Sequence, residues 1–106
     1  MAAPDEANDV YATLLEVNAW AMRAGLYEVA YHALAAALHL AESLADPKRF
    51  DTVAALAERQ QEHIDEHEPG HRLSRRSSEG RGQAGLFPTL ARQARLRATL
   101  ARTPRA

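Results

Sequence analysis

Apolar residues recur every three or four positions through the first half of the chain, the spacing that places them on one face of an α-helix. The first such stripe consists of Val10, Leu14, Val17 and Ala21. The helix that carries it should begin near Asp5 or Asn8, which are good N-caps, and close at Gly25, because glycine readily adopts the left-handed conformation. We therefore expect a short link to the next helix and antiparallel packing of the two.

A second helix is predicted from Leu26 to Ala45, and its apolar face is wide. One stripe consists of Leu26, Ala30, Ala33, Ala37, Leu40 and Leu44, and beside it lie Tyr27, Tyr31, Leu34, Leu38 and Ala41. So broad an apolar arc is typical of a central helix with neighbours on two sides. The remaining, polar face carries Glu28, His32, His39 and Glu42.

Asp46 and Pro47 mark the start of a third helix, because aspartate caps a helix and proline is tolerated at its first position. The inner face of this helix consists of Phe50, Val53, Ala54, Ala57 and Ile64. Gln60 and Gln61 weaken that face, since an apolar residue is expected there. The Pro-Gly pair at 69–70 ends the helix.

The rest of the chain changes in composition. Residues 69–85 are rich in serine, arginine and glycine and offer almost nothing to bury, so we expect a flexible linker. Residues 86–103 allow a basic C-terminal helix with Phe87, Leu90, Ala91 and Ala94 on one side. The predicted fold class is all-α: an antiparallel three-helix body of residues 1–68, made of a helical hairpin plus a third helix, followed by the linker and a fourth helix.

Composition narrows the function. The chain has no cysteine, which excludes disulfides and thiolate metal sites. It has no apolar stretch of the roughly 20 residues that a membrane span needs, and no signal-peptide pattern at its start. We therefore expect a cytoplasmic protein without membrane contacts. No serine, histidine and aspartate pattern or phosphate-binding loop points to catalysis, and we expect neither an enzyme nor a cofactor.

Charge is unevenly distributed along the chain. Residues 1–68 hold four basic residues against thirteen acidic ones, whereas residues 69–106 hold nine arginines against Glu79 alone. The basic segment either folds back on the acidic body or meets an external polyanion such as nucleic acid. The candidate polyanion-binding residues are Arg72, Arg75, Arg76, Arg81, Arg92, Arg95, Arg97 and Arg102.

The stretch 14–41 resembles a single tetratricopeptide hairpin. The residues that carry the resemblance are Leu14, Val17, Gly25, Tyr27, Ala30, Leu34, Ala37 and Leu38. The chain departs from the family pattern at Asn18, Ala21 and Glu42. A full array needs about three repeats, and the third helix does not begin a second copy, so a full array is excluded. The resemblance implies a hairpin of that geometry and, by analogy, binding of a peptide or protein partner.

Three histidines form an alternative metal site. His63 and His67 are four residues apart, so both can face one metal ion, and His71 follows. The run 63–67 also resembles the H-x-x-E-H motif of inverted zinc peptidases. However, no large catalytic domain surrounds the motif and Pro69 ends the helix directly after it. We therefore favour an acidic, solvated helix end over a metal site.

The favoured function is a non-catalytic interaction or regulatory adaptor module that acts through helix faces, with self-association as one form of it. Aromatic residues supply rigid contact area at interfaces, and the candidates here are Trp20, Tyr11, Tyr27 and Tyr31. Trp20 lies off the main inward stripe of its helix, which predicts an exposed indole. The tyrosines can instead fill the core, and for Tyr27 and Tyr31 we favour that placement. The alternative functions are nucleic-acid association through the arginine-rich segment and binding of a metal ion.

Overall fold

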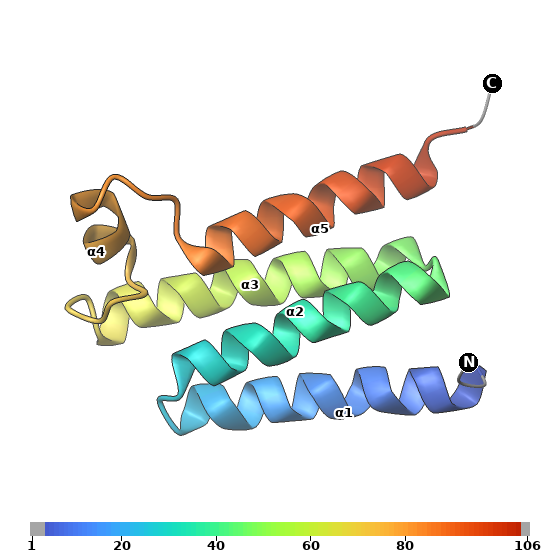
Figure 1. The fold of residues 1–106 in the computed structure, drawn as a ribbon, viewed down its shortest axis with the longest axis horizontal. Coiled ribbons are helices and arrows are strands. Elements are labelled where there is room, and N and C mark those ends of the chain that lie inside the picture. Colours follow the sequence, from blue (N-terminus) through green and yellow to red (C-terminus); the bar gives the residue numbers. More distant parts are fainter. Residues whose placement is uncertain (1–3, 105–106) are drawn as a thin grey trace.

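The computed structural model of the protein describes residues 4–104, and helices make up most of them (Figure 1). The helices are α1 (Pro4–Arg23), α2 (Tyr27–Leu44), α3 (Pro47–His67), α4 (Arg75–Gly80) and α5 (Leu86–Arg102). The described residues contain no strand, so the predicted all-α fold class is confirmed. None of these helices has the length and apolar character that crossing a bilayer requires.

The four long helices form two hairpins that lie side by side. α1 packs chiefly on α2, and α3 packs chiefly on α5 (Figure 1). α2 also contacts α3 and α5, which makes it the central helix that its wide apolar face predicts. α1 and α5 form the two outer edges of this arrangement. Each edge helix therefore keeps one side without a neighbouring helix.

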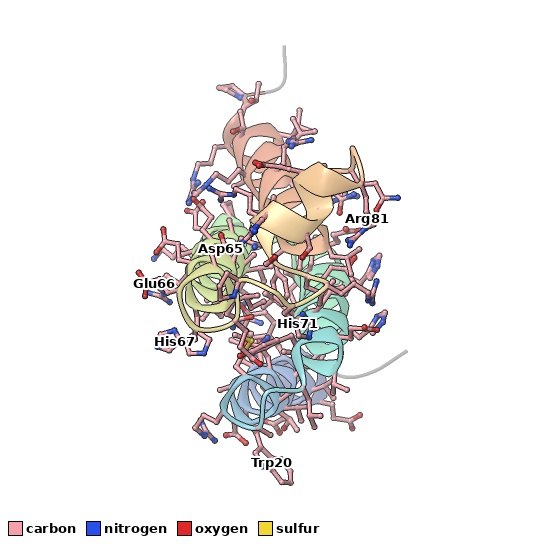
Figure 2. The ribbon with its side chains drawn as sticks, turned by 90° about the vertical axis from the view of Figure 1, so that its left-hand side faces the viewer. Trp20, Asp65, Glu66, His67, His71 and Arg81 are labelled. Carbon is pink, nitrogen blue, oxygen red and sulfur yellow. The ribbon has the colours of Figure 1, made fainter. Side chains whose placement is uncertain are left out.

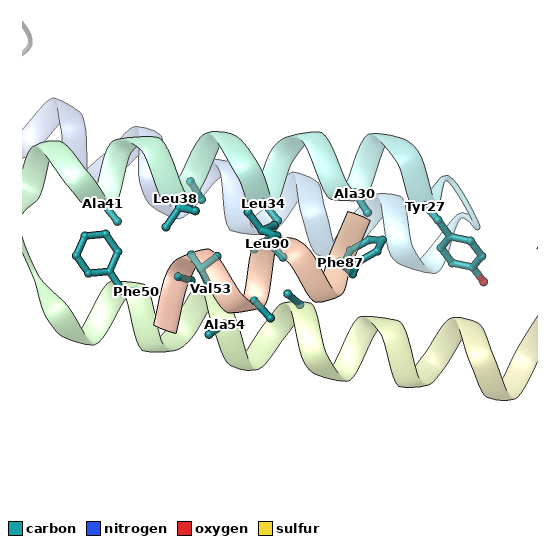
Figure 3. Packing of buried hydrophobic residues seen from close by; sticks show 14 of the residues in the cluster. Tyr27, Ala30, Leu34, Leu38, Ala41, Phe50, Val53, Ala54, Phe87 and Leu90 are labelled. Atoms are coloured by element: carbon teal, nitrogen blue, oxygen red, sulfur yellow. The ribbon is translucent and has the colours of Figure 1, made fainter. Parts of the chain in front are cut away.

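Alanines and a few large side chains build the core between the hairpins (Figure 3). Leu34 of α2, Val53 and Ile64 of α3, and Phe87 of α5 are fully buried. The Phe87 ring meets Tyr31 edge to face, with the ring centroids 5.8 Å apart. The predicted inner side of the C-terminal helix is therefore confirmed, and α5 shares the core of the acidic body.

The inward face of α1 differs from the predicted stripe. Val10 is 51% exposed and Val17 36% exposed, whereas Tyr11 and Asn18 are buried. The helix is thus rotated by about one residue relative to the prediction. The observed stripe, with Tyr11, Asn18 and Ala21, has the same spacing but contains a polar residue. Asn18 is tolerated there because its amide is hydrogen-bonded to Gln60. The prediction that Val10 and Val17 face the core is wrong, as is the prediction for Leu26, which is 54% exposed.

Both predicted helix junctions are confirmed in position. Gly25 adopts φ 74°, and the Leu26 N–H donates to the Ala21 carbonyl at 2.8 Å, which closes α1 with a left-handed cap. At the next junction Ala45 takes the left-handed conformation, with φ 52°. Asp46 then caps α3 by accepting the Lys48 N–H at 3.0 Å.

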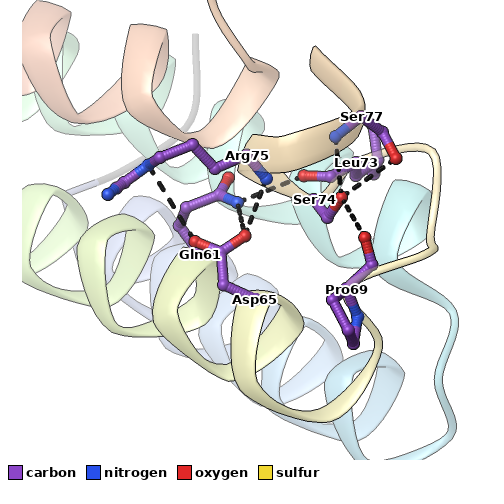
Figure 4. Close-up of polar contacts among 7 residues, drawn as sticks. All are labelled: Gln61, Asp65, Pro69, Leu73, Ser74, Arg75 and Ser77. Carbon is purple, nitrogen blue, oxygen red and sulfur yellow. Dashed lines mark hydrogen bonds and ion pairs between the residues drawn. The ribbon is translucent and has the colours of Figure 1, made fainter. Parts of the chain in front are cut away.

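The segment 69–85, predicted as a linker with little to bury, contains α4 and several buried residues (Figure 4). Leu73, Ser74 and Ser78 are all at most 3% exposed. The Ser74 hydroxyl accepts the Ser77 N–H at 3.0 Å and donates to the Pro69 carbonyl at 2.7 Å. The prediction that almost nothing here is buried is wrong, because serines that read as solvent-exposed linker residues in the sequence cap a short helix and pair with the backbone.

Candidate functional site

Large apolar side chains gather at the α1 edge of the molecule. Trp20 is 67% exposed and points away from the rest of the structure (Figure 2). We call the exposed set the edge patch, and it consists of Val10, Val17 and Trp20 of α1 with Leu26 and Val29 at the start of α2. A hollow of about 200 Å³ lies in this region, lined by Val17, Trp20, Ala21, Ala24, Leu26 and Val29. The prediction of an exposed Trp20 indole is confirmed.

The three tyrosines predicted as alternative contact residues lie elsewhere. Tyr11 and Tyr27 belong to the core and are 8% and 4% exposed, respectively. Tyr31 is half-buried between His32 and Phe87. The Arg49 guanidinium lies 4.8 Å from the centroid of the Tyr11 ring and covers it. Of the four aromatic candidates, Trp20 alone is largely exposed.

Tyr27 lies at the wall of a groove between α1 and α3 that has a volume of about 610 Å³ and is also lined by Met22, Leu56 and His63. The Glu68 side chain beside its hydroxyl, together with burial, raises the pKa of Tyr27 to about 12. The His71 ring packs edge-on against the Tyr27 ring, with centroids 5.0 Å apart. Tyr27 thus joins the start of α2 to the end of α3, and its pKa lies far from neutral.

In a pH titration of tyrosine absorbance, Tyr27 should ionise at a higher pH than an ordinary tyrosine. We expect a phenolate absorbance step near pH 12 that Tyr27→Phe removes and Glu68→Ala moves down toward the ordinary value near 10. Because the folded pKa is the higher one, the stabilisation by the neutral hydroxyl is complete below pH 10 and is lost as pH rises from 10 to 12. Far-ultraviolet circular dichroism over the same range shows whether the fold persists. A step that stays near pH 12 in Glu68→Ala would contradict this pairing.

The three candidate metal ligands do not converge. The rings of His63 and His67 stack, with centroids 4.3 Å apart, while His71 packs on Tyr27 instead. Nδ1 of His71 accepts the Leu73 N–H at 3.0 Å, so this nitrogen is already occupied. Among residues 4–104 there is no group of three or more histidine, cysteine, aspartate or glutamate side chains placed to hold a metal ion.

Most of the candidate polyanion-binding arginines face acidic side chains of the body. The ion pairs are Arg72 with Glu28, Arg75 with Asp65, Arg95 with Glu58, Arg97 with Glu42 and Arg102 with Asp51. The Arg97 and Arg102 pairs have N–O distances of 2.9 Å and 2.6 Å. The remaining candidates are Arg76, Arg81 and Arg92, and Arg81 donates to the Arg72 carbonyl at 2.9 Å. The uneven charge along the sequence is therefore largely compensated within the molecule.

These pairs change the acidity of the carboxylates that they join. The Arg72 guanidinium lowers the pKa of Glu28, and the Arg102 guanidinium lowers the pKa of Asp51, in both cases through a direct hydrogen bond. All of these groups are on the surface, where water and salt screen them, so each pair contributes little to stability by itself. Two of the pairs, Arg95 with Glu58 and Arg102 with Asp51, join the basic α5 to the acidic α3.

Sequence reasoning missed a buried amide pair between the two hairpins. Nδ2 of Asn18 donates to Oε1 of Gln60 at 2.9 Å and to the Ala30 carbonyl at 2.8 Å. Gln60 returns a hydrogen bond from Nε2 to Oδ1 of Asn18 at 2.5 Å. Both side chains are at most 8% exposed. The signal in the sequence is a pair of amides, one on each of two helices, each three or four residues from apolar residues on the inner face of its helix.

Comparison with known proteins assigns no family to the chain. No protein-family model matches it, and no curated protein or solved structure shows significant similarity to it. The resemblance to a tetratricopeptide hairpin stays a prediction. The edge patch must therefore be interpreted from its own residues.

Proposed function

We propose that the protein is a non-catalytic interaction module of adaptor or regulatory type, which binds a protein partner through the edge patch. The observation that carries the proposal is the exposed Trp20 ring beside a hollow lined by apolar residues. Tryptophan is the residue most often responsible for binding energy at protein interfaces, where it fills pockets in the centre of the contact. Contiguous exposed apolar surface is typical of interaction sites.

The buried polar groups support a role without catalysis. The buried polar side chains of the described residues are Asn18, Gln60, Gln61, Ser74 and Ser78. Amides and hydroxyls of this kind do not titrate near neutral pH, whereas acid and base catalysis needs groups that do. Tyr27 has a pKa raised to about 12, which removes it further from such work. We assign these buried polar side chains a role in stabilising the fold and the exposed surface a role in binding.

The test measures the yield of cross-linked complexes of the tagged full chain in the cells that produce it. It compares the wild type with two variants in which one side chain is replaced by alanine. Trp20→Ala should lower the yield of the complex more than tenfold, because loss of a central aromatic costs about 2 kcal/mol or more. Leu100→Ala is the matched control, since Leu100 is 63% exposed on α5 at the opposite edge. Identical complexes from the wild type and both variants would refute the proposal.

A further inference from the structure

The outer face of α1 has the spacing of a coiled-coil seam. Val10, Thr13, Val17 and Trp20 of α1, with Ala24 directly after the helix, follow one another at intervals of three and four residues, and all five are exposed. Such a seam is what one helix presents to a second helix that packs along it. The neighbouring side of α1 is already used, because Tyr11, Asn18 and Ala21 face the core. The seam therefore fits a helix from outside this chain.

Charged residues beside the seam indicate which helix that is. Asp9, Glu16 and Arg23 are exposed, seven residues apart, and form one row along the seam. When two copies of α1 pack antiparallel, Asp9 of each copy lies beside Arg23 of the other, and the twofold axis forms this pair twice. In parallel packing the two rows lie on opposite sides of the seam, so Asp9 and Arg23 do not meet. Glu16 meets its equivalent near the axis in either arrangement, in a position open to solvent.

The apolar residues fit the same antiparallel arrangement. With the axis level with Leu15, Val10 of one copy lies opposite Trp20 of the other, and Thr13 lies opposite Val17. Val10 is 51% exposed in this chain and is small enough to enter the hollow between Trp20, Leu26 and Val29. The residues from α2 widen the contact beyond a single helix, which a specific interface requires.

We infer that the partner at the edge patch is a second copy of this chain, bound by antiparallel packing of α1 on α1 about a twofold axis. This inference rests on the proposed function, since it names the partner of the same surface. The contact is isologous, so each copy uses the same patch and the assembly closes as a dimer. One helix and the start of another give an interface at the small end of specific contacts, and we expect a dissociation constant in the micromolar range.

Sedimentation equilibrium of the full chain across micromolar concentrations tests the inference. The wild type and Leu100→Ala should dimerise, whereas Trp20→Ala should remain monomeric. Asp9→Arg and Arg23→Asp each place like charges opposite one another and should weaken the dimer about tenfold. The double variant Asp9→Arg/Arg23→Asp restores opposite charges only in the antiparallel arrangement, and it should recover the affinity. Circular dichroism checks that each variant is folded.

Each other outcome overturns the inference in a distinguishable way. A wild type that stays monomeric excludes the dimer, and the proposed function then stands only if a different protein is cross-linked through Trp20. A dimer that Trp20→Ala does not weaken uses another surface. A double variant as weak as the single ones excludes antiparallel packing of α1.

Discussion

Replacement of Phe87 by alanine should lower the free energy of unfolding by about 3–5 kcal/mol, the usual cost of truncating a buried aromatic residue. The ring is fully buried and contacts Tyr31 edge to face, so its loss leaves a cavity between α2 and α5 (Figure 3). Small domains have only about 5–15 kcal/mol of stability in total. The variant should therefore unfold at a much lower urea concentration, as followed by circular dichroism.

The control for this prediction is a truncation on the exposed side of the same helix. Leu100 is 63% exposed, so Leu100→Ala should change stability by less than about 0.5 kcal/mol. If Phe87→Ala does not fold, Phe87→Leu removes fewer buried atoms and gives a smaller loss that can still be compared. Equal stability of the Phe87 and Leu100 variants would mean that α5 is not docked on the body.

Asn18→Ala should cost about 2–4 kcal/mol, because it leaves both polar atoms of the buried Gln60 amide without their partner. The double variant Asn18→Leu/Gln60→Leu removes both amides together, so it should be destabilised by less than the sum of Asn18→Leu and Gln60→Leu. We expect a coupling energy of about 1–3 kcal/mol from urea unfolding of the four proteins. Additive losses would show that the two amides act independently.

The sequence predicts the helices well wherever local chemistry is decisive. Gly25 closes α1 because an exposed left-handed position favours glycine, and Asp46 with Pro47 starts α3 because a cap and a fixed φ suit a helix start. The wide face of α2 predicts its central position for the same kind of reason. These features depend on residues within one or two turns of each other.

The predictions are wrong where a residue far along the chain determines which side chains are buried. Asn18 reads as a polar interruption of a helix face, and only Gln60, far along the chain, makes it acceptable in the core. This pairing selects the stripe with Tyr11 and turns Val10 and Val17 outward. In segment 69–85 the Gln61 amide donates to the Leu73 carbonyl at 3.2 Å, a contact that no local pattern indicates (Figure 4).

The candidate site also has one part that local helical geometry predicts and another that depends on contacts between helices. Helical geometry alone places Trp20 off the inward stripe, and the structure confirms its exposure. The hollow beside it needs α2 as well, because Leu26 and Val29 form one of its walls. The uneven charge leaves two interpretations open in the sequence, and the ion pairs between α5 and α3 depend on how α5 folds back on α3.

The two hairpins differ in the length of chain that joins their helices. Three residues, 24–26, connect α1 to α2, whereas residues 68–85 separate α3 from α5. Closing a longer loop costs more conformational entropy, so the second hairpin starts at a disadvantage. Nearby contacts also form sooner than distant ones. We therefore expect the hairpin of α1 and α2 to form first during folding, and α3 and α5 to pack on it afterwards.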